Sequence, residues 1–594
     1  MTTTETVQAK SAGSAPTPPR GRKRTTSLAA HGEPMVWLTG GSLALGLLMV
    51  FGLLALVLVR GVSTFWPSEV VRFVTSDGEV VVGEVGAVEV RELSEQQLDQ
   101  LAARQGEAVA EAVRRNGGVT ERRRVRSVDM EETAKNITAW YDDFWLATAP
   151  EGLAGAWDRA VTTPEWMLHV ERYDEGRYFG EFVGFEDENG RVVDLEEAWS
   201  AFQAARPTTK ELRSRFKKIL EHDIGAISRE TRSAKLDAAK AELNHGEGSP
   251  KHLAAVAEAE RVASENVVLT EALYSEAAEI EEEGRQAAIL VRNAEDEVES
   301  IAMWEVVRAF RANTIQGADA WALYADRWSE YLTANPRKAN TEGGVYPAIF
   351  GTVLLTLLMV FAVVPFGVLA ALYLREYAKQ GVIVSTVRIA VNNLAGVPSI
   401  VFGVFGLGFF CYVIGGDIID PLFFAHYGNE PVFGGGGILW ASLTLALLTL
   451  PVVIVATEEA LAAVPGSMRE GSYACGATKW QTMRRIVLPR AMPGIMTGMI
   501  LAVARGAGEV APLMLVGAVQ VAESLPLDSS GLHPERRFMH LGFHIYDLGF
   551  KSPDSEAAIP MVYTTTLLLI TIVVVLNLAG IWVRTRLRKR FSAA

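Results

Sequence analysis

The segment REGSYACGATKWQTMRRIVLPRA, residues 469–491, decides how this chain is organised. It combines several basic residues with one glutamate and a Leu-Pro pair near its end, and it lies between two long runs with almost no charge. A polar segment of helical composition between two such runs is typical of a loop that joins two membrane spans. We therefore expect a membrane protein in which this segment lies outside the bilayer.

Six runs are long and apolar enough to cross a membrane, which takes about 20 residues for roughly 30 Å of hydrocarbon. The chain has 594 residues, of which 49% are hydrophobic. The first run follows a polar tail and is longer than the apolar core of a secretory signal, so we predict a permanent span rather than a cleavable signal peptide. The predicted spans are 35–60, 345–374, 382–414, 433–457, 491–519 and 560–583, the last five within a core over 345–590.

Lysine and arginine mark one side of the membrane. They cluster before the first span, between spans two and three, in the 469–491 segment and after the last span. With six spans all four clusters fall on one side, and basic loops face the cytoplasm. We therefore expect a multi-pass protein with both termini and a loop over 457–490 in the cytoplasm. Residues 1–33 are predicted to be a disordered basic tail that touches membrane lipid.

A large segment, residues 61–344, is expected on the extracytoplasmic side. It is rich in acidic residues, and the whole chain has a net charge of −14, which argues against nucleic acid as a partner. It holds no cysteine, so it has no disulfide framework. β-branched runs around Asp77-Gly78 and around Asn189-Gly190 predict two β-hairpins, and residues 94–115 a helical stretch between them. We expect a small α+β module over 62–205.

From 207 to 310 the composition changes to Ala, Glu, Lys, Arg and Leu, and apolar residues recur at helical spacing up to Ile301. The break NHGEGSP divides this stretch, and its Ser249-Pro250 pair is a good helix start. The pattern predicts an antiparallel helical hairpin, and a coiled coil is one form it could take.

The 469–491 segment carries a spaced signature. Glu470, Gly476, Ile486, Leu488 and Pro489 stand at spacings 0, 6, 16, 18 and 19. This resembles the loop signature of ATP-binding-cassette importer permeases: Glu-Ala-Ala, three residues, Gly, nine residues, Ile, one residue, Leu-Pro. Two other small residues replace the alanines. A short helix with a glycine bend can dock in a groove of a separate ATPase, and we expect the proline to end the interfacial segment before span five. The alternative is a plain amphipathic loop on the membrane.

The resemblance implies a transport subunit rather than an enzyme. The chain has no Gly-x-x-x-x-Gly-Lys-Ser/Thr phosphate loop, so ATP and magnesium are expected on a separate ATPase and no cofactor on this chain. Its nine histidines show no convincing zinc spacing, and we predict no metal site.

Three further stretches narrow the resemblance: NNLAGVPSIVFGVFGLG at 392–408, LPVVIVATEEALAAVPGSMREGSYACGATKWQT at 450–482 and ARGAGEVAPLML at 504–515. Together they resemble the PstA family of phosphate-importer permeases, over 345–590 but not over most of 62–340. The resemblance implies a mainly α, six-span type I importer permease of the bacterial inner membrane, here with an inserted extracytoplasmic α+β and helical-hairpin domain. It implies a PstC-like sister permease, a PstB-like ATPase dimer and a PstS-like phosphate-binding protein. The sister PstC type, and a phosphate-status sensor or scaffold, are the alternatives.

The stretch at 504–515 holds the candidate substrate residues. Arg505 and Glu509 are four residues apart, which places them on one face if span five is one helix. Ionisable groups inside a span usually face a pathway or a partner, and the planar fork of an arginine suits phosphate oxygens. A purely structural ion pair is the alternative. Gly506 and Gly508 would allow close helix contact, and Pro512 would kink the span.

Other polar residues near the spans leave their roles open. Asn393, Pro398 and Ser399 are expected to shape the start of span three, where they would line the pathway or pack. Glu458 and Glu459 end span four, where they would touch the ATPase or mark the water boundary.

Overall fold

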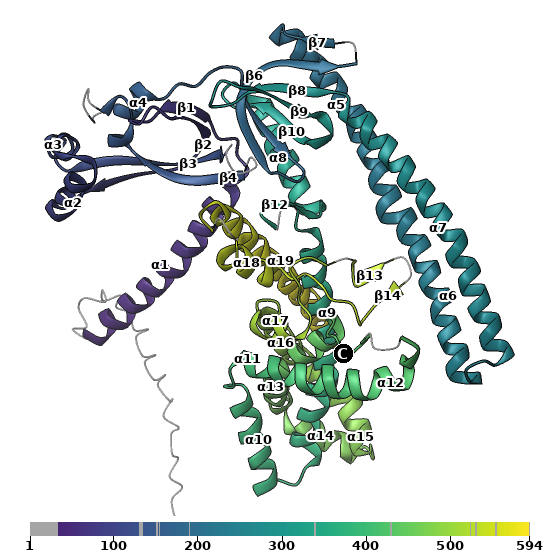
Figure 1. Cartoon of the computed structure of the whole chain (residues 1–594). Helices are drawn as coiled ribbons and strands as arrows, with labels where there is room; N and C mark the ends of the chain where they lie inside the picture. The colour runs from purple at the N-terminus through teal and green to yellow at the C-terminus, as the bar shows by residue number, and fades with distance from the viewer. Residues whose placement is uncertain are drawn as a thin grey trace, which may run out of the picture. The chain divides into compact units, whose positions relative to one another are not determined.

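The computed structural model describes residues 34–129, 135–149, 153, 155–188, 190–337, 340–427, 431–522, 524–528, 531–552 and 555–592. The tail predicted over 1–33 lies outside these residues. Within them the chain is mainly helical, and six helices are long and apolar enough to cross a membrane, which confirms the predicted fold class (Figure 1). The six candidate spans are Trp37–Ser63, Tyr346–Tyr377, Ser399–Phe423, Ile438–Ala462, Lys479–Gly506 and Ala558–Lys589.

Span three begins later than predicted. The short helix α10 (Val382–Leu394) is separate, and a new helix, α11 (Ser399–Phe405), starts after a bend. Pro398 is the cause, because it has no N–H to donate and it disfavours helical backbone at the residue before it. The predicted span over 382–414 is therefore wrong at its start. The π-helical η8 (Gly406–Ile419) and α12 (Asp420–Phe423) complete the span.

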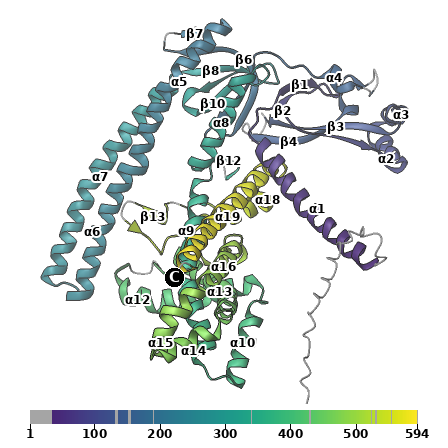
Figure 2. The ribbon, with the colours of Figure 1, turned by 180° about the vertical axis from the view of Figure 1, so that it is seen from behind.

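The spans pack through small and aliphatic residues. α13 (Ile438–Ala462) lies against α9 (Tyr346–Leu372) and against α16 (Leu488–Gly506) (Figure 2). Close approach matters here because lipid is as apolar as the side chains, so packing rather than water drives association. At Gly351 of α9 an added Cβ would lie 2.0 Å from the carbonyl oxygen of Met539. The shorter elements beside the spans are η9 (Ala425–Tyr427), α17 (Ala511–Val516), β13 (Leu527–Asp528), β14 (Gly531–Leu532) and α18 (Leu541–Phe550), before α19 (Ser555–Ser592).

The segment between spans one and two, here called the insertion, contains two antiparallel sheets. The first has the order β1-β2-β3-β4, and Val74 pairs with Val80 around the predicted Asp77-Gly78 turn, which confirms that hairpin. The second has the order β10-β5-β6-β8-β9, with β7 on β6; Asn189 of its predicted turn lies outside the described residues. The strands and helices of this part are β1 (Val70–Val74), β2 (Val80–Glu92), α2 (Glu95–Gln105), α3 (Glu107–Arg115), β3 (Val119–Asp129), β4 (Lys135–Asp142), η2 (Asp143–Trp145), α4 (Ala156–Ala160), β5 (Met167–Arg172), β6 (Arg177–Asp187) and β7 (Gly190–Val192).

The helical hairpin starts and ends earlier than predicted. Its first arm is one uninterrupted helical run over 195–245 that ends in α6 (Ile224–His245), and its second arm is α7 (Pro250–Arg285). The two arms lie side by side in Figures 1 and 2, and Ser249 caps α7 by accepting from the amide of His252. The prediction over 207–310 is wrong beyond α7, because residues 288–311 form strands of the second sheet. The remaining elements are α5 (Leu195–Lys217), the π-helical η4 (Lys218–Asp223), β8 (Ala288–Arg292), β9 (Val298–Ala302), η5 (Met303–Glu305) and β10 (Val306–Arg311).

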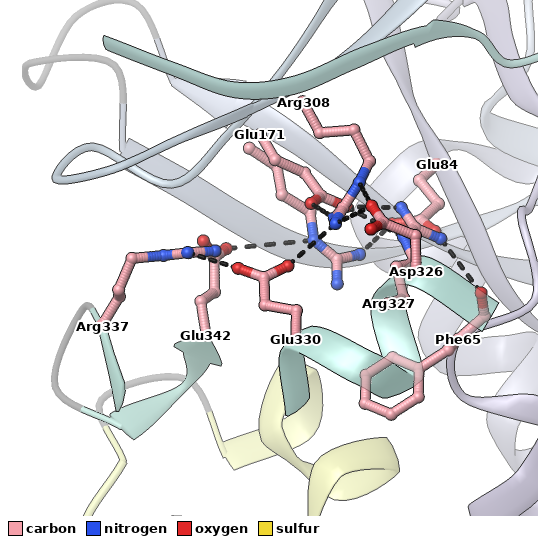
Figure 3. A network of polar contacts seen from close by, with 10 residues as sticks. Phe65, Glu84, Glu171, Arg308, Asp326, Arg327, Glu330, Arg337 and Glu342 are labelled. Atoms are coloured by element: carbon pink, nitrogen blue, oxygen red, sulfur yellow. Dashed lines mark hydrogen bonds and ion pairs between the residues drawn. The ribbon is translucent and has the colours of Figure 1, made fainter. Parts of the chain in front are cut away.

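A buried charge network joins the second sheet to α8 (Gly317–Thr333), the helix that leads towards span two (Figure 3). Glu171 of β5 pairs with Arg308 of β10 and, at 2.6 Å, with Arg327 of α8. Arg308 also reaches Glu330 of α8 at 3.0 Å. Burial alone would raise the pKa of Glu171, but Arg327 and Arg308 outweigh it and hold that pKa well below its usual value. The network therefore requires an ionised Glu171.

The other side of α8 rests on the span helices. The fully buried Tyr331 has its hydroxyl 2.9 Å from the hydroxyl of Thr565 in α19, and its ring lies 5.1 Å from that of Phe65. The short pair β11 (Pro336–Arg337) and β12 (Glu342–Gly343) follows α8 and leads into α9. Because α8 is held on both sides, it fixes the insertion to the start of span two and to α19.

Candidate functional site

The 469–491 segment folds as two short helices with a sharp bend between them. α14 (Gly466–Ala474) ends at Gly476, whose φ of +80° is left-handed. The amide of Gly476 donates to Tyr473 O and that of Ala477 to Ser472 O, which is the Schellman arrangement that ends many helices. A glycine is needed there because other residues adopt this backbone conformation only with strain. Thr478 then caps the next helix, α15 (Lys479–Thr482).

The segment has an exposed outer side and a buried inner side. Glu470 is exposed, as are Tyr473 at 42% and Trp480 at 56%. On the inner side, Met483 and Val487 are fully buried, in a cluster with side chains from the neighbouring ends of spans two and four. Of the predicted coupling residues, Leu488 packs against this cluster and Ile486 is half-buried. The outer side thus offers a surface to a partner, and the inner side is packed on the spans.

Pro489 does not end the interfacial helix as predicted. The helix runs without interruption from Lys479 to Gly506, through the π-helical turn η10 (Met483–Val487) into α16. A π turn widens the helix by one residue and so accommodates a proline, which has no N–H to donate. The predicted span over 491–519 is therefore misplaced by roughly three and a half turns at each end, because the observed span is Lys479–Gly506.

Arg505 and Glu509 do not share one continuous helix face. α16 ends at Gly506, the chain is non-helical over 507–510, and α17 starts at Ala511 with Pro512 in its first turn. The two side chains still lie together, with Arg505 Nε 3.8 Å from Glu509 Oε1. This is an ion pair, but it is too long for a hydrogen bond. The break precedes Pro512, so that proline starts a helix instead of kinking one.

The Arg505 side chain keeps unused donor capacity. It is 35% exposed, and its buried Nε has no hydrogen-bond partner in the part of the chain that the structure describes. A guanidinium has five N–H donors, and one long ion pair satisfies few of them. The arrangement can therefore receive an oxyanion while Glu509 limits how tightly it is held.

The other predicted pathway residues, among those that the structure describes, make no hydrogen bond or ion pair with Arg505 or Glu509. Asn393 is exposed at the end of α10, and Pro398 and Ser399 begin α11. Among the described residues, no hydrogen bond or ion pair joins any of the three to Arg505 or Glu509.

The close packing of span five is only partly as predicted. An added Cβ at Gly506 would lie 2.3 Å from the sulfur of Met359, whereas at Gly508 the nearest atom is 3.9 Å away. Gly506 therefore allows a close helix contact and Gly508 does not serve one. In the described ranges of the chain, no group of three metal-binding side chains is found.

Comparison with known proteins supplies the family. The model for the binding-protein-dependent transport system inner membrane component matches residues 363–593. The phosphate transport system permease protein PstA 1 of Mycobacterium tuberculosis (strain H37Rv) is 36% identical over 273 residues, which cover 44% of this chain and 80% of that protein. The chain belongs to this permease family. It is thus a permease subunit of an ATP-binding-cassette importer and a multi-pass inner-membrane protein, and such a component has no catalytic site of its own.

Other relatives match over shorter stretches. The probable ABC transporter permease protein YqgH of Bacillus subtilis (strain 168) is 33% identical over 34% of this chain and 62% of that protein, a little under two thirds of its length. Among solved structures, the inward-facing MetNI methionine ABC transporter has 20% identity and a TM-score of 0.30 over 40% of this chain and 94% of that one. The range matched by the family model, residues 363–593, begins after the insertion.

Sequence reasoning missed three residues of this permease that hold the 469–491 segment in place; this segment is called the coupling segment below, after its expected role at the ATPase. Arg469, Lys479 and Glu376 join α14 and α15 to the end of span two. The sequence alone assigns both cations only to the basic segment that sets the orientation of the chain. A signal was available, because Glu376 is an acidic residue in an otherwise basic loop between spans two and three. Glu458, whose role the sequence left open, pairs with Arg388 of α10 at 3.3 Å, while Glu459 is exposed.

Proposed function

We propose that this permease carries phosphate inward, as a PstA-type subunit that forms the translocation pathway together with a sister permease. The observation that carries the proposal is Arg505 at the end of α16, with an incomplete ion pair and donors left over for an oxyanion. The printed names of several relatives, including PstA of Mycobacterium leprae, 40% identical over 33% of this chain and 60% of that protein, support phosphate as the substrate.

The non-helical stretch that follows span five supports a pathway at this place. Backbone that is not helical exposes N–H and C=O groups, and within a membrane it is tolerated only where it is covered by protein or lines a water-filled cavity. The break at 507–510 directly follows Arg505 and contains Glu509. Polar backbone and a partly free guanidinium at one point are suited to a passing anion.

The chemistry follows from the two charges. Arg505 donates paired hydrogen bonds to phosphate oxygens, which an arginine fork matches in geometry. Glu509 stays within ion-pair reach and competes for the guanidinium, so phosphate is held weakly enough to leave. The Glu509 carboxylate also accepts a hydrogen bond from a protonated phosphate oxygen. No bond is made or broken, and the energy comes from ATP hydrolysed elsewhere.

The proposed assembly has four kinds of component. This chain pairs with a PstC-like permease, and its exposed coupling segment docks on a PstB-like ATPase dimer that holds ATP and magnesium. A PstS-like protein delivers phosphate on the side of the insertion. Both termini lie in the cytoplasm, and residues 61–344 lie outside the membrane.

The test is labelled-phosphate uptake in cells whose only copy of this subunit is the test gene. Arg505→Gln is compared with Arg388→Gln, a matched control: Arg388 is 33% exposed and pairs with Glu458, while Arg505 is 35% exposed and pairs with Glu509. We expect uptake to be lost only in Arg505→Gln, with both variants present in the membrane and bound to the ATPase. Equal uptake in the two variants would make the Arg505 pair structural. No uptake by the intact, assembled chain would favour a sensor or another substrate.

A further inference from the structure

One guanidinium in the coupling segment makes three polar contacts, to the ends of two different spans. Arg469 of α14 donates to Leu461 O at 2.8 Å and to Val464 O at 2.6 Å, at the end of span four. It also pairs at 3.0 Å with Glu376, in the π-helical turn η7 (Tyr373–Tyr377) that ends span two. The side chains of Arg469 and Glu376 are 18% and 12% exposed, so solvent screens this pair little.

The contacts to span four satisfy a local requirement. The last carbonyls of a helix have no partner within the helix, and an arginine that reaches them also complements the negative end of the helix dipole. Because these two carbonyls fix the guanidinium plane, the remaining donor points at Glu376 in a set direction. A lysine has a single ammonium and would not make all three contacts.

The second half of the coupling segment meets the same turn of span two. Lys479, the first residue of α15, donates to the carbonyl oxygen of Glu376 and lies 4.9 Å from the ring centre of Tyr377. α14 and α15 therefore both hold η7, one through a side-chain carboxylate and the other through a backbone carbonyl. Between them, Ser472 and Thr482 join the two helices through a buried hydroxyl pair at 2.8 Å.

The charged clamp faces away from the surface offered to a partner. Glu470, Tyr473 and Trp480 are exposed, whereas Arg469 and Glu376 are largely covered. A residue turned inward cannot contribute much to binding an ATPase. It can, however, decide whether a movement of α14 is passed to the spans or absorbed by rotation of α14 on its apolar inner side.

We propose that Arg469 and Glu376 are positioning residues that transmit displacement of the coupling segment to spans two and four, and that they do not contribute to docking of the ATPase. This inference rests on the proposed function as an ATP-driven importer subunit. Without the clamp, the ATPase binds and hydrolyses ATP, but the spans follow incompletely.

The experiment uses the complete complex in proteoliposomes. Glu376→Gln and Arg469→Lys are compared with intact protein and with Arg485→Gln, an exposed cation of the same segment with no ion pair among the described residues. Three quantities are measured: ATPase retained on purification, ATP hydrolysed with and without the binding protein, and phosphate delivered per ATP. We expect retention to be unchanged, and both the stimulation by the binding protein and the phosphate per ATP to fall about tenfold in the two clamp variants.

Two results would overturn the inference. Unchanged stimulation and yield would show that the clamp is only packing, and loss of the ATPase in proportion to activity would place these residues in docking. Arg469→Lys keeps the positive charge at this position. A folding defect would be recognised because both Arg469→Lys and Glu376→Gln would then be depleted from the membrane. Stimulation by the binding protein does not require phosphate to be the transported solute. If the binding protein stimulated ATP hydrolysis by the intact complex but no phosphate were delivered, the proposed substrate would be refuted. The clamp would still be tested, by the stimulation alone.

Discussion

Two ion pairs on one strand differ mainly in burial, so comparing them measures how burial changes the stability that an ion pair contributes. Glu84 and Glu89 both lie in β2, and each has a carboxylate oxygen 2.6 Å from an arginine, Arg177 and Arg122 respectively. The Glu84 side chain is 12% exposed and that of Glu89 50%. Burial alone would raise the pKa of Glu84, but Arg177 and its neighbours outweigh it and lower that pKa from 4.5 to about 2. Glu84 also links the two sheets, since Arg177 belongs to β6.

The expected effect of Glu84→Gln follows from that pKa. Lowering the pKa of Glu84 from 4.5 to about 2 corresponds to about 3 kcal/mol of stability at neutral pH, while an exposed pair such as Glu89–Arg122 contributes about 0–1 kcal/mol. The folded pKa lies below the unfolded one, so this stability is present above pH 4.5 and is lost as the pH falls towards 2. Glu84→Gln should lack this contribution to stability at every pH, whereas the stability of Glu89→Gln should barely differ from that of intact protein.

Hydrogen exchange on the full-length chain in detergent measures this locally. The slow amides of β2 and β6 should exchange roughly 100-fold faster in Glu84→Gln at pH 7, and no more than about fivefold faster in Glu89→Gln. Intact protein should lose protection between pH 4.5 and 2, and the difference from Glu84→Gln should shrink over that range. Equal acceleration in the two variants would refute the reasoning, because it would mean that burial does not distinguish the pairs.

Two further predictions concern buried groups. The His169 ring lies edge-on to Phe179 and tilted against Phe310, with ring centres 5.0 and 4.8 Å away. Burial lowers its pKa from 6.5 to about 3, so its stability contribution is complete above pH 6.5 and declines as the pH falls towards 3. His169→Phe should remove about 2 kcal/mol of the loss of stability between pH 6.5 and 5, and hydrogen exchange of β5 that keeps the same pH dependence would contradict this. Gly351→Ala would place a Cβ 2.0 Å from Met539 O and should cost about 1–3 kcal/mol, whereas Gly408→Ala has nothing within 4 Å; thermal unfolding of the purified chain compares them, and equal midpoints would mean that α9 moves aside freely.

The pattern of apolar residues in the sequence predicted helices and strands well where local residues alone determine the structure. The Asp77-Gly78 hairpin is fixed by local turn chemistry and alternation, so it could be found without the rest of the chain. Residues 288–311 could not, because their apolar positions also fit a helical spacing when counted across the turn at Asn293–Glu297. Only the partner strands β5 and β6 decide between the two readings, and they lie a hundred residues earlier in the sequence.

In the coupling segment, too, features set by nearby residues could be predicted and features set by distant residues could not. Gly476 could be assigned a bend from its type and spacing alone, and the structure gives it a left-handed φ. The clamp on Glu376 depends on which helix ends meet at one side of the membrane, and nothing local to Arg469 reveals that. Arg505 and Glu509 were brought together by their spacing, yet they meet across a helix end instead of along a helix face.

One continuous helix connects the two candidate sites of this permease. It starts at Lys479, which holds the end of span two, and ends at Gly506, next to Arg505. At about 1.5 Å per residue its length is roughly 40 Å. A helix that ended at Pro489, as the sequence suggested, would leave a flexible joint between coupling segment and pathway. The π turn before that proline keeps the helix intact, and Glu509 lies beyond its far end. Under the proposed function, a tilt of this helix at Lys479 would therefore change the 3.8 Å separation of Arg505 and Glu509, and with it the hold on phosphate.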